Sequence, residues 1–169
     1  MTMTEELIDW IDDDDNVISV VTRSRMRAEA LLHRSVGIHV WSADGRVLVH
    51  RRANDKDLHP GYWDLGAGGV VSAGESYNDA AARELAEELG VRDVRLEELG
   101  RGRFNSVAFA TIAHFYRVVY DGPFSFDDGE IAEARFVSVS MLREMITTLP
   151  FMPDTLALSG PFIPGLELS

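Results

Sequence analysis

The chain has 169 residues, 46% of them apolar, which is enough for one domain with a buried core. Its 16 Lys and Arg face 28 Asp and Glu, and the resulting net charge of −12 repels nucleic acids and anionic membranes. The chain has no cysteine, which excludes disulfides, thiolate metal sites and cysteine nucleophiles. We therefore expect neither a nucleic-acid partner nor a membrane partner.

The compartment follows from three features of the chain. No apolar run approaches the roughly 20 residues that span a bilayer. The first residues, Met-Thr-Met-Thr-Glu-Glu, lack the basic and apolar regions of a secretory signal. The lack of cysteine is compatible with a reducing compartment. We expect a cytoplasmic protein.

The first part of the chain predicts strands around turns. Asp12 to Asp15 form an acidic turn that we interpret as solvated, since a calcium loop needs regularly spaced ligands and a glycine. A second turn, Ala43-Asp44-Gly45, predicts a hairpin between the strands on either side of it. The elements expected here, in chain order, are strands 8–11 and 17–21, a helix over 24–32, and strands 35–41 and 46–52.

The second part of the chain alternates loops, helices and strands. Residues 53–69 contain Pro60 and four glycines and are expected to be loop. The elements expected after them are a helix over 80–89, strands 94–100, 107–120 and 134–138, a helix over 140–148 and a short helix near 154–158. Few helices between many strands indicate a mixed sheet between helical layers. No repeat or second domain is visible, so residues 1–169 are expected to form a single domain.

The helix over 80–89 carries an unusual group of acids. At 100° per residue, Glu84, Glu87 and Glu88 share one arc of roughly 100°. The adjacent core face has Ala81, Ala82, Leu85 and Leu89. Ser76 with Asp79 is a start signal, and Gly90 is a stop signal.

This arrangement of acids is costly. Like charges at Glu84 and Glu88, four residues apart, lose roughly 0.2–0.5 kcal/mol. Anions in the last turns of a helix lose about 0.3–1 kcal/mol each against the helix dipole. A divalent cation bound by the carboxylates would compensate, and magnesium prefers such oxygen ligands. A solvated acidic face is the alternative interpretation.

The wider spacing of these residues resembles a known family. Gly69, Glu75, Arg83-Glu84-Leu85, Glu87-Glu88 and Gly90-Val91 match the signature of the Nudix hydrolases at every fixed position, and residues 60–65 resemble its lead-in. The resemblance implies an α/β/α sandwich with a mixed β-sheet. It also implies a loop–helix–loop site over 69–91 that hydrolyses a diphosphate linkage.

The resemblance also implies roles for the motif residues. Glu84, Glu87 and Glu88, with the main-chain carbonyl of Gly69, are expected to hold Mg²⁺ or Mn²⁺. Glu88 is the expected base that orients or deprotonates water, with Glu87 beside it. Glu75 and Arg83 are expected to support the site by an ion pair between the loop and the helix.

Three residues outside the motif are further candidates. Glu130, which we favour over Glu133, resembles a downstream position that supplies another ligand or base in some family members. Arg51 and Arg52 are candidates for binding the substrate phosphates, since a guanidinium can contact phosphate through two bonds. Alternate side chains of a strand face opposite ways, so we expect only Arg52 to point inward. The five histidines are scattered and are assigned structural roles.

Residues outside the motif narrow the resemblance to the branch that includes isopentenyl diphosphate isomerase. Residues 16–18, 23, 32–34, 51–52 and 61–63 carry this likeness. The catalytic cysteine of the isomerase falls at Gly68, and two of its metal-binding histidines fall at Val70 and Met26. These replacements argue for a hydrolase on an isomerase-like scaffold. In that scaffold, residues 1–34 are a hairpin and helix extension and 150–169 are a tail.

The function expected from the sequence is metal-dependent hydrolysis. The substrate is a nucleoside diphosphate derivative, a nucleotide or a related organic diphosphate, attacked by metal-activated water. Two alternatives stay open: an isomerase of isoprenoid diphosphates, disfavoured by the missing cysteine, and a module that senses a nucleotide without cleaving it. The resemblance is also compatible with a homodimer.

Overall fold

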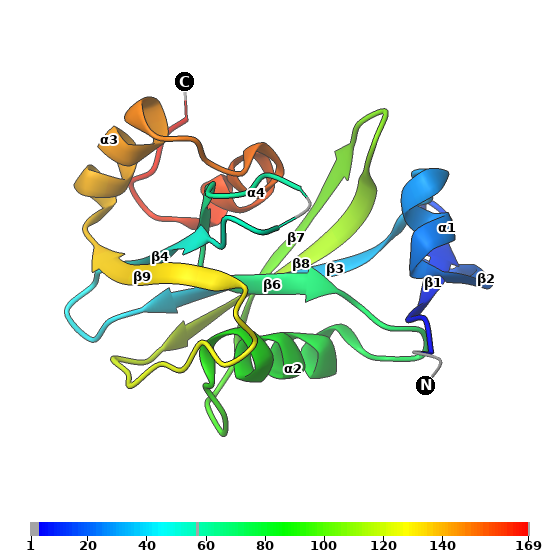
Figure 1. Cartoon of the computed structure of the whole chain (residues 1–169), viewed down its shortest axis with the longest axis horizontal. Helices are drawn as coiled ribbons and strands as arrows, with labels where there is room; N and C mark the ends of the chain where they lie inside the picture. Colours follow the sequence, from blue (N-terminus) through cyan, green and yellow to red (C-terminus); the bar gives the residue numbers. More distant parts are fainter. Residues whose placement is uncertain (1–3, 57, 169) are drawn as a thin grey trace.

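A mixed β-sheet with helices on both faces forms the centre of the molecule (Figure 1). The computed structural model describes residues 4–56 and 58–168. Its strands are β1 (Leu7–Ile11), β2 (Val17–Thr22), β3 (His33–Trp41), β4 (Val47–Arg52), β5 (Trp63–Leu65), β6 (Ala67–Val70), β7 (Glu97–Asn105), β8 (Ala110–Val119) and β9 (Ile131–Val137). Its helices are α1 (Arg23–Ala28), α2 (Tyr77–Leu89), α3 (Val139–Thr148), α4 (Pro153–Ser159) and the 3₁₀ helix η1 (Gly160–Phe162). The α/β sandwich with a mixed sheet expected from the sequence is confirmed.

Strand β3 is the centre of the sheet. It runs parallel to β8 along its whole length and antiparallel to β6 over residues 35–38. The expected hairpin between residues 35–41 and 46–52 forms only at its turn, where Trp41 pairs with Val47. Beyond that pair β6 occupies the edge of β3, and β4 pairs instead with β5 and β9. The two strands thus separate and leave room for a site between them.

Helix α2 covers one face of the sheet. Ser76 caps it by accepting a hydrogen bond from the amide of Asp79, and Gly90 ends it in the left-handed conformation at φ 67°. The helix therefore begins at Tyr77, one turn earlier than expected. Ala80, Ala81, Leu85 and Leu89 are buried, whereas Ala82, expected on this face, is exposed. The four buried residues form an apolar cluster with side chains of β3, β6 and β8.

Helices α3 and α4 and the segment after them cover the other face (Figure 1). Ser138 caps α3 through the amide of Met141. A second apolar cluster fills this layer, with Trp41, Val47, Val49, Trp63, Leu65, Val137, Leu142, Met145, Phe151, Ile163 and Leu166. The segment expected as a tail is therefore part of the core. No helix in the described part of the chain is long and apolar enough to cross a bilayer.

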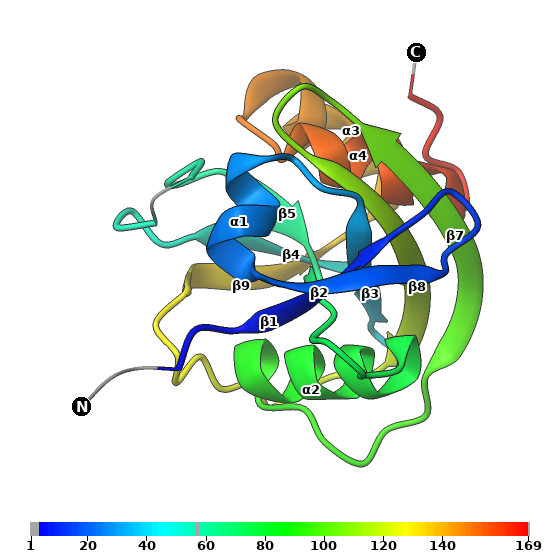
Figure 2. The same ribbon diagram turned by 90° about the vertical axis from the view of Figure 1, so that its right-hand side faces the viewer.

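The first strands and α1 form a separate hairpin unit that lies across one end of the sheet (Figure 2). Ile8, Val21 and Met26 pack on Val70 of β6. Helix α1 ends at Ala28 instead of residue 32, because Ala30 turns to positive φ and the chain enters β3. The unit thus rests on the strand that leads into α2.

The largest error of the sequence prediction concerns residues 53–69. Strands β5 and β6 lie there, in a segment expected to be loop. Glycine-rich Ala67–Val70 has low strand propensity, but pairing with β3 overrides it. The neighbouring backbone comes so close that a Cβ at Gly68 would lie 2.6 Å from the carbonyl oxygen of Val36. Strand β7 also runs on to Asn105, and β8 begins at Ala110 instead of residue 107.

Gly66 links β5 to β6 and gives a test of this close packing. It has φ +51°, and an added Cβ would lie 1.8 Å from the carbonyl oxygen of Ile38. Gly66→Ala is expected to lower the free energy of unfolding by roughly 3 kcal/mol or more. Gly45→Ala, at φ +84° with nothing within 4 Å, should lose only about 1–2 kcal/mol. Urea denaturation of both variants checks this, and equal losses would contradict the close approach.

Candidate active site

Arg83 joins the loop before α2 to the helix. Its Nε and Nη2 lie 2.8 and 2.9 Å from the two carboxylate oxygens of Glu75, and Nη2 also donates to the carbonyl of Val70 at 3.1 Å. Nη1 lies 2.7 Å from Glu84 and 3.4 Å from Glu87. Hydrogen bonding from Arg83 lowers the pKa of Glu75. One guanidinium thus serves three carboxylates and holds β6 against the helix.

Glu84 lies directly against Gly69. A Cβ at Gly69 would be 2.3 Å from a carboxylate oxygen of Glu84, so only glycine lets the loop approach this side chain. Burial raises the pKa of the Glu84 carboxyl, although Arg83 opposes the rise. The structure therefore brings Glu84 and Gly69 together, as a shared ligand pair requires.

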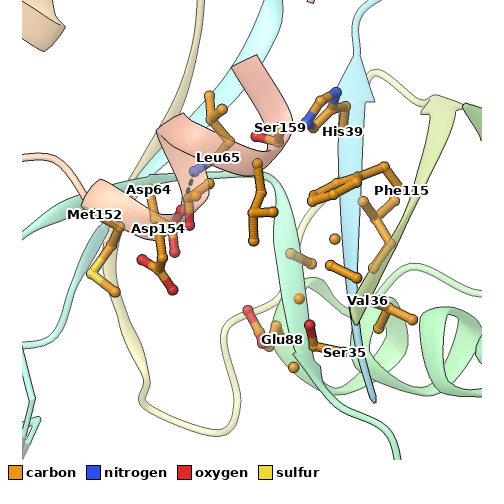
Figure 3. A pocket seen from close by; sticks show the side chains of 18 of the residues that line it. Ser35, Val36, His39, Asp64, Leu65, Glu88, Phe115, Met152, Asp154 and Ser159 are labelled. Atoms are coloured by element: carbon orange, nitrogen blue, oxygen red, sulfur yellow. Dashed lines mark hydrogen bonds between the residues drawn. The ribbon is translucent and has the colours of Figure 1, made fainter. Parts of the chain in front are cut away.

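Glu88 lies one turn further along α2 and lines a cavity of about 210 Å³ (Figure 3). Burial raises the pKa of its carboxyl well above the ordinary value. Repulsion from surrounding carboxylates adds to the rise, and these belong to Glu84, Asp64, Glu130 and Asp128. Glu88 is therefore a partly buried acid in an acidic environment.

The cavity lies where β3 and β4 separate. Strands β3, β4, β5, β6 and β8 with helices α2 and α4 all contribute to its walls. Glu130, at the start of β9, also lines it, and Lys56 holds that carboxylate at 2.9 Å. Further acids come from Asp64 of β5 and Asp154 of α4 (Figure 3). Four carboxylates thus surround one small space.

Arg52 and Arg51 face opposite ways, as strand geometry requires. Arg52 lines the cavity, where its Nη2 donates to the carbonyl of Leu58 at 3.1 Å and its buried Nε has no partner among the described residues. Arg51 lies outside the cavity and contacts Glu133 at 3.4 Å. Glu87 is also outside, with 54% of its side chain exposed. The cavity therefore brings together Gly69, Glu88, Glu130 and Arg52, but neither Arg51 nor Glu87.

The family of the chain follows from comparison with known proteins. The sequence profile of the NUDIX domain matches residues 31–157. The chain belongs to the Nudix family. It is 41% identical over 151 residues to the "Uncharacterized Nudix hydrolase PA4841" of Pseudomonas aeruginosa, covering 89% of both chains. It is 34% identical over 151 residues to "Uncharacterized Nudix hydrolase YfcD" of Escherichia coli, covering 89% of this chain and 83% of that protein.

Solved structures show the same Nudix fold. The crystal structure of DR0079 from Deinococcus radiodurans has a TM-score of 0.76 at 24% identity, covering 88% of this chain and 94% of that one. The NUDIX domain of Shewanella oneidensis NrtR, complexed with ADP ribose, has a TM-score of 0.59 at 18% identity, covering 81% and 94%. Family and relatives together identify the protein as a Nudix hydrolase.

The side chains expected to bind metal have the oxygen atoms that divalent cations prefer, but they do not converge on one point among the described residues. In residues 4–56 and 58–168, no three Asp, Glu or His side chains converge on one point. Arg83 instead holds Glu84 and Glu87. Burial, with repulsion from neighbouring carboxylates, raises the pKa of Glu84 and Glu88, so a cation beside them would favour their ionised form. Carboxylate oxygens with such charge are the donors that magnesium and manganese prefer.

Gly68, Val70 and Met26, which the sequence analysis compares with isomerase groups, are held by packing in this structure. At Gly68 the backbone of β3 leaves no room for a side chain, cysteine included. Met26 and Val70 lie in one apolar cluster with Ile8 and Val21.

Several residues of the cavity had no role in the sequence analysis. Asp64, His39, His50, Asp154 and Ser159 all line it. Asp64 lies in a segment that the sequence predicts to be loop. The sequence therefore gave no indication that Asp64 pairs with His50 between β5 and β4. Asp154 and Ser159 lie in α4, which no motif connects to the site. A strand predicted at β5 would have indicated a position for Asp64 beside β4, but it would not have placed Asp154 or Ser159.

The buried charge of Glu88 predicts a pH-dependent stability. Its pKa is higher in the folded state than the ordinary 4.5, so the folded state binds the proton more tightly. The contribution of Glu88 to the free energy of unfolding is therefore fully present below about pH 4.5, and it is lost as the pH rises through the folded-state pKa of Glu88. In metal-free protein at pH 7, Glu88→Gln should raise the free energy of unfolding by about 1–3 kcal/mol.

The increase in the free energy of unfolding caused by Glu88→Gln should disappear toward acid pH, because wild-type Glu88 is then protonated and neutral as well. Urea denaturation in a chelator, from neutral to acid pH, measures it. Glu144→Gln, on an exposed site of α3, is the matched control and should change little. If the free energy of unfolding of Glu88→Gln at neutral pH is no greater than that of wild type, the ionised Glu88 side chain does not destabilise the folded state and the prediction is wrong.

Proposed function

We propose that the protein uses Mg²⁺ or Mn²⁺ to hydrolyse the diphosphate linkage of a nucleoside diphosphate derivative, a nucleotide or a related organic diphosphate. The partly buried Glu88 carboxyl, in the wall of the cavity that Arg52 also lines, carries this proposal. It is an acid–base group in the same cavity as Arg52, the one arginine among the described residues of the cavity wall.

Glu84 and Glu88, with Gly69, are the residues best placed to hold the cation, and Glu87 completes the set expected from the sequence. The bound cation lowers the pKa of a coordinated water and neutralises charge on phosphoryl oxygens. It would also relieve the repulsion between the carboxylates that line the cavity.

The chain's own groups divide the remaining work. Arg52 binds a phosphoryl oxygen of the substrate and orients the linkage. Glu88, with Glu130 as the second candidate, accepts the proton of the attacking water, since both line the cavity. Glu75 and Arg83 position Glu84 without touching the substrate.

Net charge and fold also support a small-molecule substrate. At −12 the chain repels a nucleic-acid backbone, and the cavity is smaller than the roughly 300–1,000 Å³ of a typical ligand pocket. The NrtR domain of the same fold was solved with ADP ribose, which supports a nucleotide-like substrate. A cytoplasmic location, expected from the sequence composition, and a homodimer, expected from the family resemblance, are also part of this proposal.

Removal of the acids should abolish turnover. Glu88→Gln and Glu87→Gln are each expected to lower kcat roughly 10²- to 10⁴-fold. The measurement follows phosphate release from a panel of organic diphosphates and nucleotides with Mg²⁺, Mn²⁺ or chelator, with and without added phosphatase. The phosphatase arm shows which bond breaks, and Glu144→Gln serves as control. A wild-type enzyme inactive across the panel, or a Glu88→Gln variant at full rate, would defeat the proposal.

The two neighbouring arginines separate phosphate binding from structure. Arg52→Lys loses the forked contact with phosphate and is expected to raise KM roughly 10- to 100-fold. Arg51→Lys changes the same side chain on the opposite face, where it contacts Glu133, and should leave KM within about twofold. Steady-state kinetics on the best substrate decide between them. Equal effects of both changes would show that Arg52 does not contact the substrate.

A further inference from the structure

Two polar side chains at the inner end of the cavity have no partners. His39 of β3 and Ser159 of α4 are each only 1% exposed. Within residues 4–56 and 58–168, neither ring nitrogen of His39 nor the Ser159 hydroxyl has a hydrogen-bond partner. Figure 3 shows both at the end of the cavity opposite Glu88. Buried polar groups without partners are costly and rare, so they indicate a ligand that completes their hydrogen bonds.

The surroundings of His39 favour an uncharged ligand. Burial lowers the pKa of His39 to about 4, so the imidazole is neutral near pH 7 and offers one donor and one acceptor. Phe115 lies beside it with ring centroids 6.1 Å apart, and its ring packs over Gly37, where a Cβ would come within 2.6 Å. This end of the cavity is thus aromatic on one side and polar on the other.

Asp64 adds acceptors to the same cavity. One of its carboxylate oxygens accepts a hydrogen bond from the amide of Leu65 at 2.8 Å. Asp154, beside it in Figure 3, contributes a second carboxylate. Two acids repel phosphate but accept hydrogen bonds from N–H groups. Arg52 lies close enough to oppose the rise in the pKa of Asp64, so a phosphate bound by Arg52 and a group rich in N–H donors bound by Asp64 would be neighbours in the cavity.

We propose that Asp64, His39 and Ser159 bind the non-phosphate group of the substrate, and that this group is an uncharged heterocycle with an amino substituent, as in adenine, guanine or cytosine. The inference rests on the proposed function for the position of the phosphates. An isoprenoid chain would leave the polar atoms of His39 and Ser159 unpaired. Ser159 lies two residues beyond residue 157, where the match to the NUDIX profile ends.

The first test compares stability with ligand binding. Ser159→Ala and His39→Leu remove polar atoms that have no partner, so each should raise the Tm, by roughly 2–4 °C. The same variants should bind adenosine, guanosine or cytidine about tenfold more weakly in chemical-shift titrations. A structural role would lower stability and leave binding unchanged. A lower Tm with unchanged nucleoside affinity in both variants would overturn the proposal.

The second test uses ligand pairs that differ at the amino group. Guanosine and adenosine are each compared with inosine, and cytidine with uridine, in protein without metal. Wild type is expected to prefer the amino member of at least one pair by about 10- to 100-fold. Asp64→Asn should remove this preference, while Asp93→Asn, the same change at an exposed position, should keep it.

These titrations need neither phosphate nor metal, so they stand apart from the test of hydrolysis. An enzyme that binds amino nucleosides but cleaves no diphosphate would refute the proposed function and leave the subsite standing. Wild type that binds no nucleoside, or prefers inosine and uridine, or an Asp64→Asn variant with the preference intact, would overturn the subsite. Where turnover is found, kcat/KM for the matching nucleotide pairs should follow the same order.

Discussion

The structure depends on one guanidinium that serves several carboxylates. Arg83 holds Glu75, Glu84 and the carbonyl of Val70 together, and so fixes the glycine-rich strand β6 on helix α2. With that strand in place, Gly69 rests against Glu84, and Glu88 reaches the wall of the cavity. A single positive charge cannot neutralise three acids. The excess negative charge left at Glu84 and Glu88 is the property on which a cation-dependent site would rely.

The cavity joins groups of different chemistry. Arg52 is the cation suited to phosphate, and it lies on the pocket face of β4, which leaves β3 after one pair. Asp64 lies close enough to Glu88 to raise its pKa and close enough to Arg52 to feel its charge. His39 and Ser159 supply unpaired polar atoms at the end opposite Glu88 (Figure 3). The proposed sites for the phosphates and for the organic group of the substrate therefore share one cavity, which α4 helps to close.

The scaffold also shows how packing limits the groups that a site can hold. Strand β6 pairs too closely with β3 for any side chain at Gly68. Met26 and Val70 pack together and attach the N-terminal hairpin to the sheet. The acids of the Nudix motif lie on the neighbouring helix α2, from which Glu88 reaches the cavity.

The sequence by itself determined the features that depend on local spacing. The period of the helix placed Glu84 and Glu88 on one arc, Ser76 and Gly90 bounded that helix, and strand alternation separated Arg52 from Arg51. Only the tertiary structure decided where β5, β6 and α4 lie, because their positions come from pairing and packing with distant strands, which overrides weak local propensity. Glu87 lies on the same arc of the helix but outside the cavity, and its role as a metal ligand stays a prediction. Asp64, His39 and Ser159, far apart in the chain, became neighbours of one cavity only when the sheet and α4 closed around it.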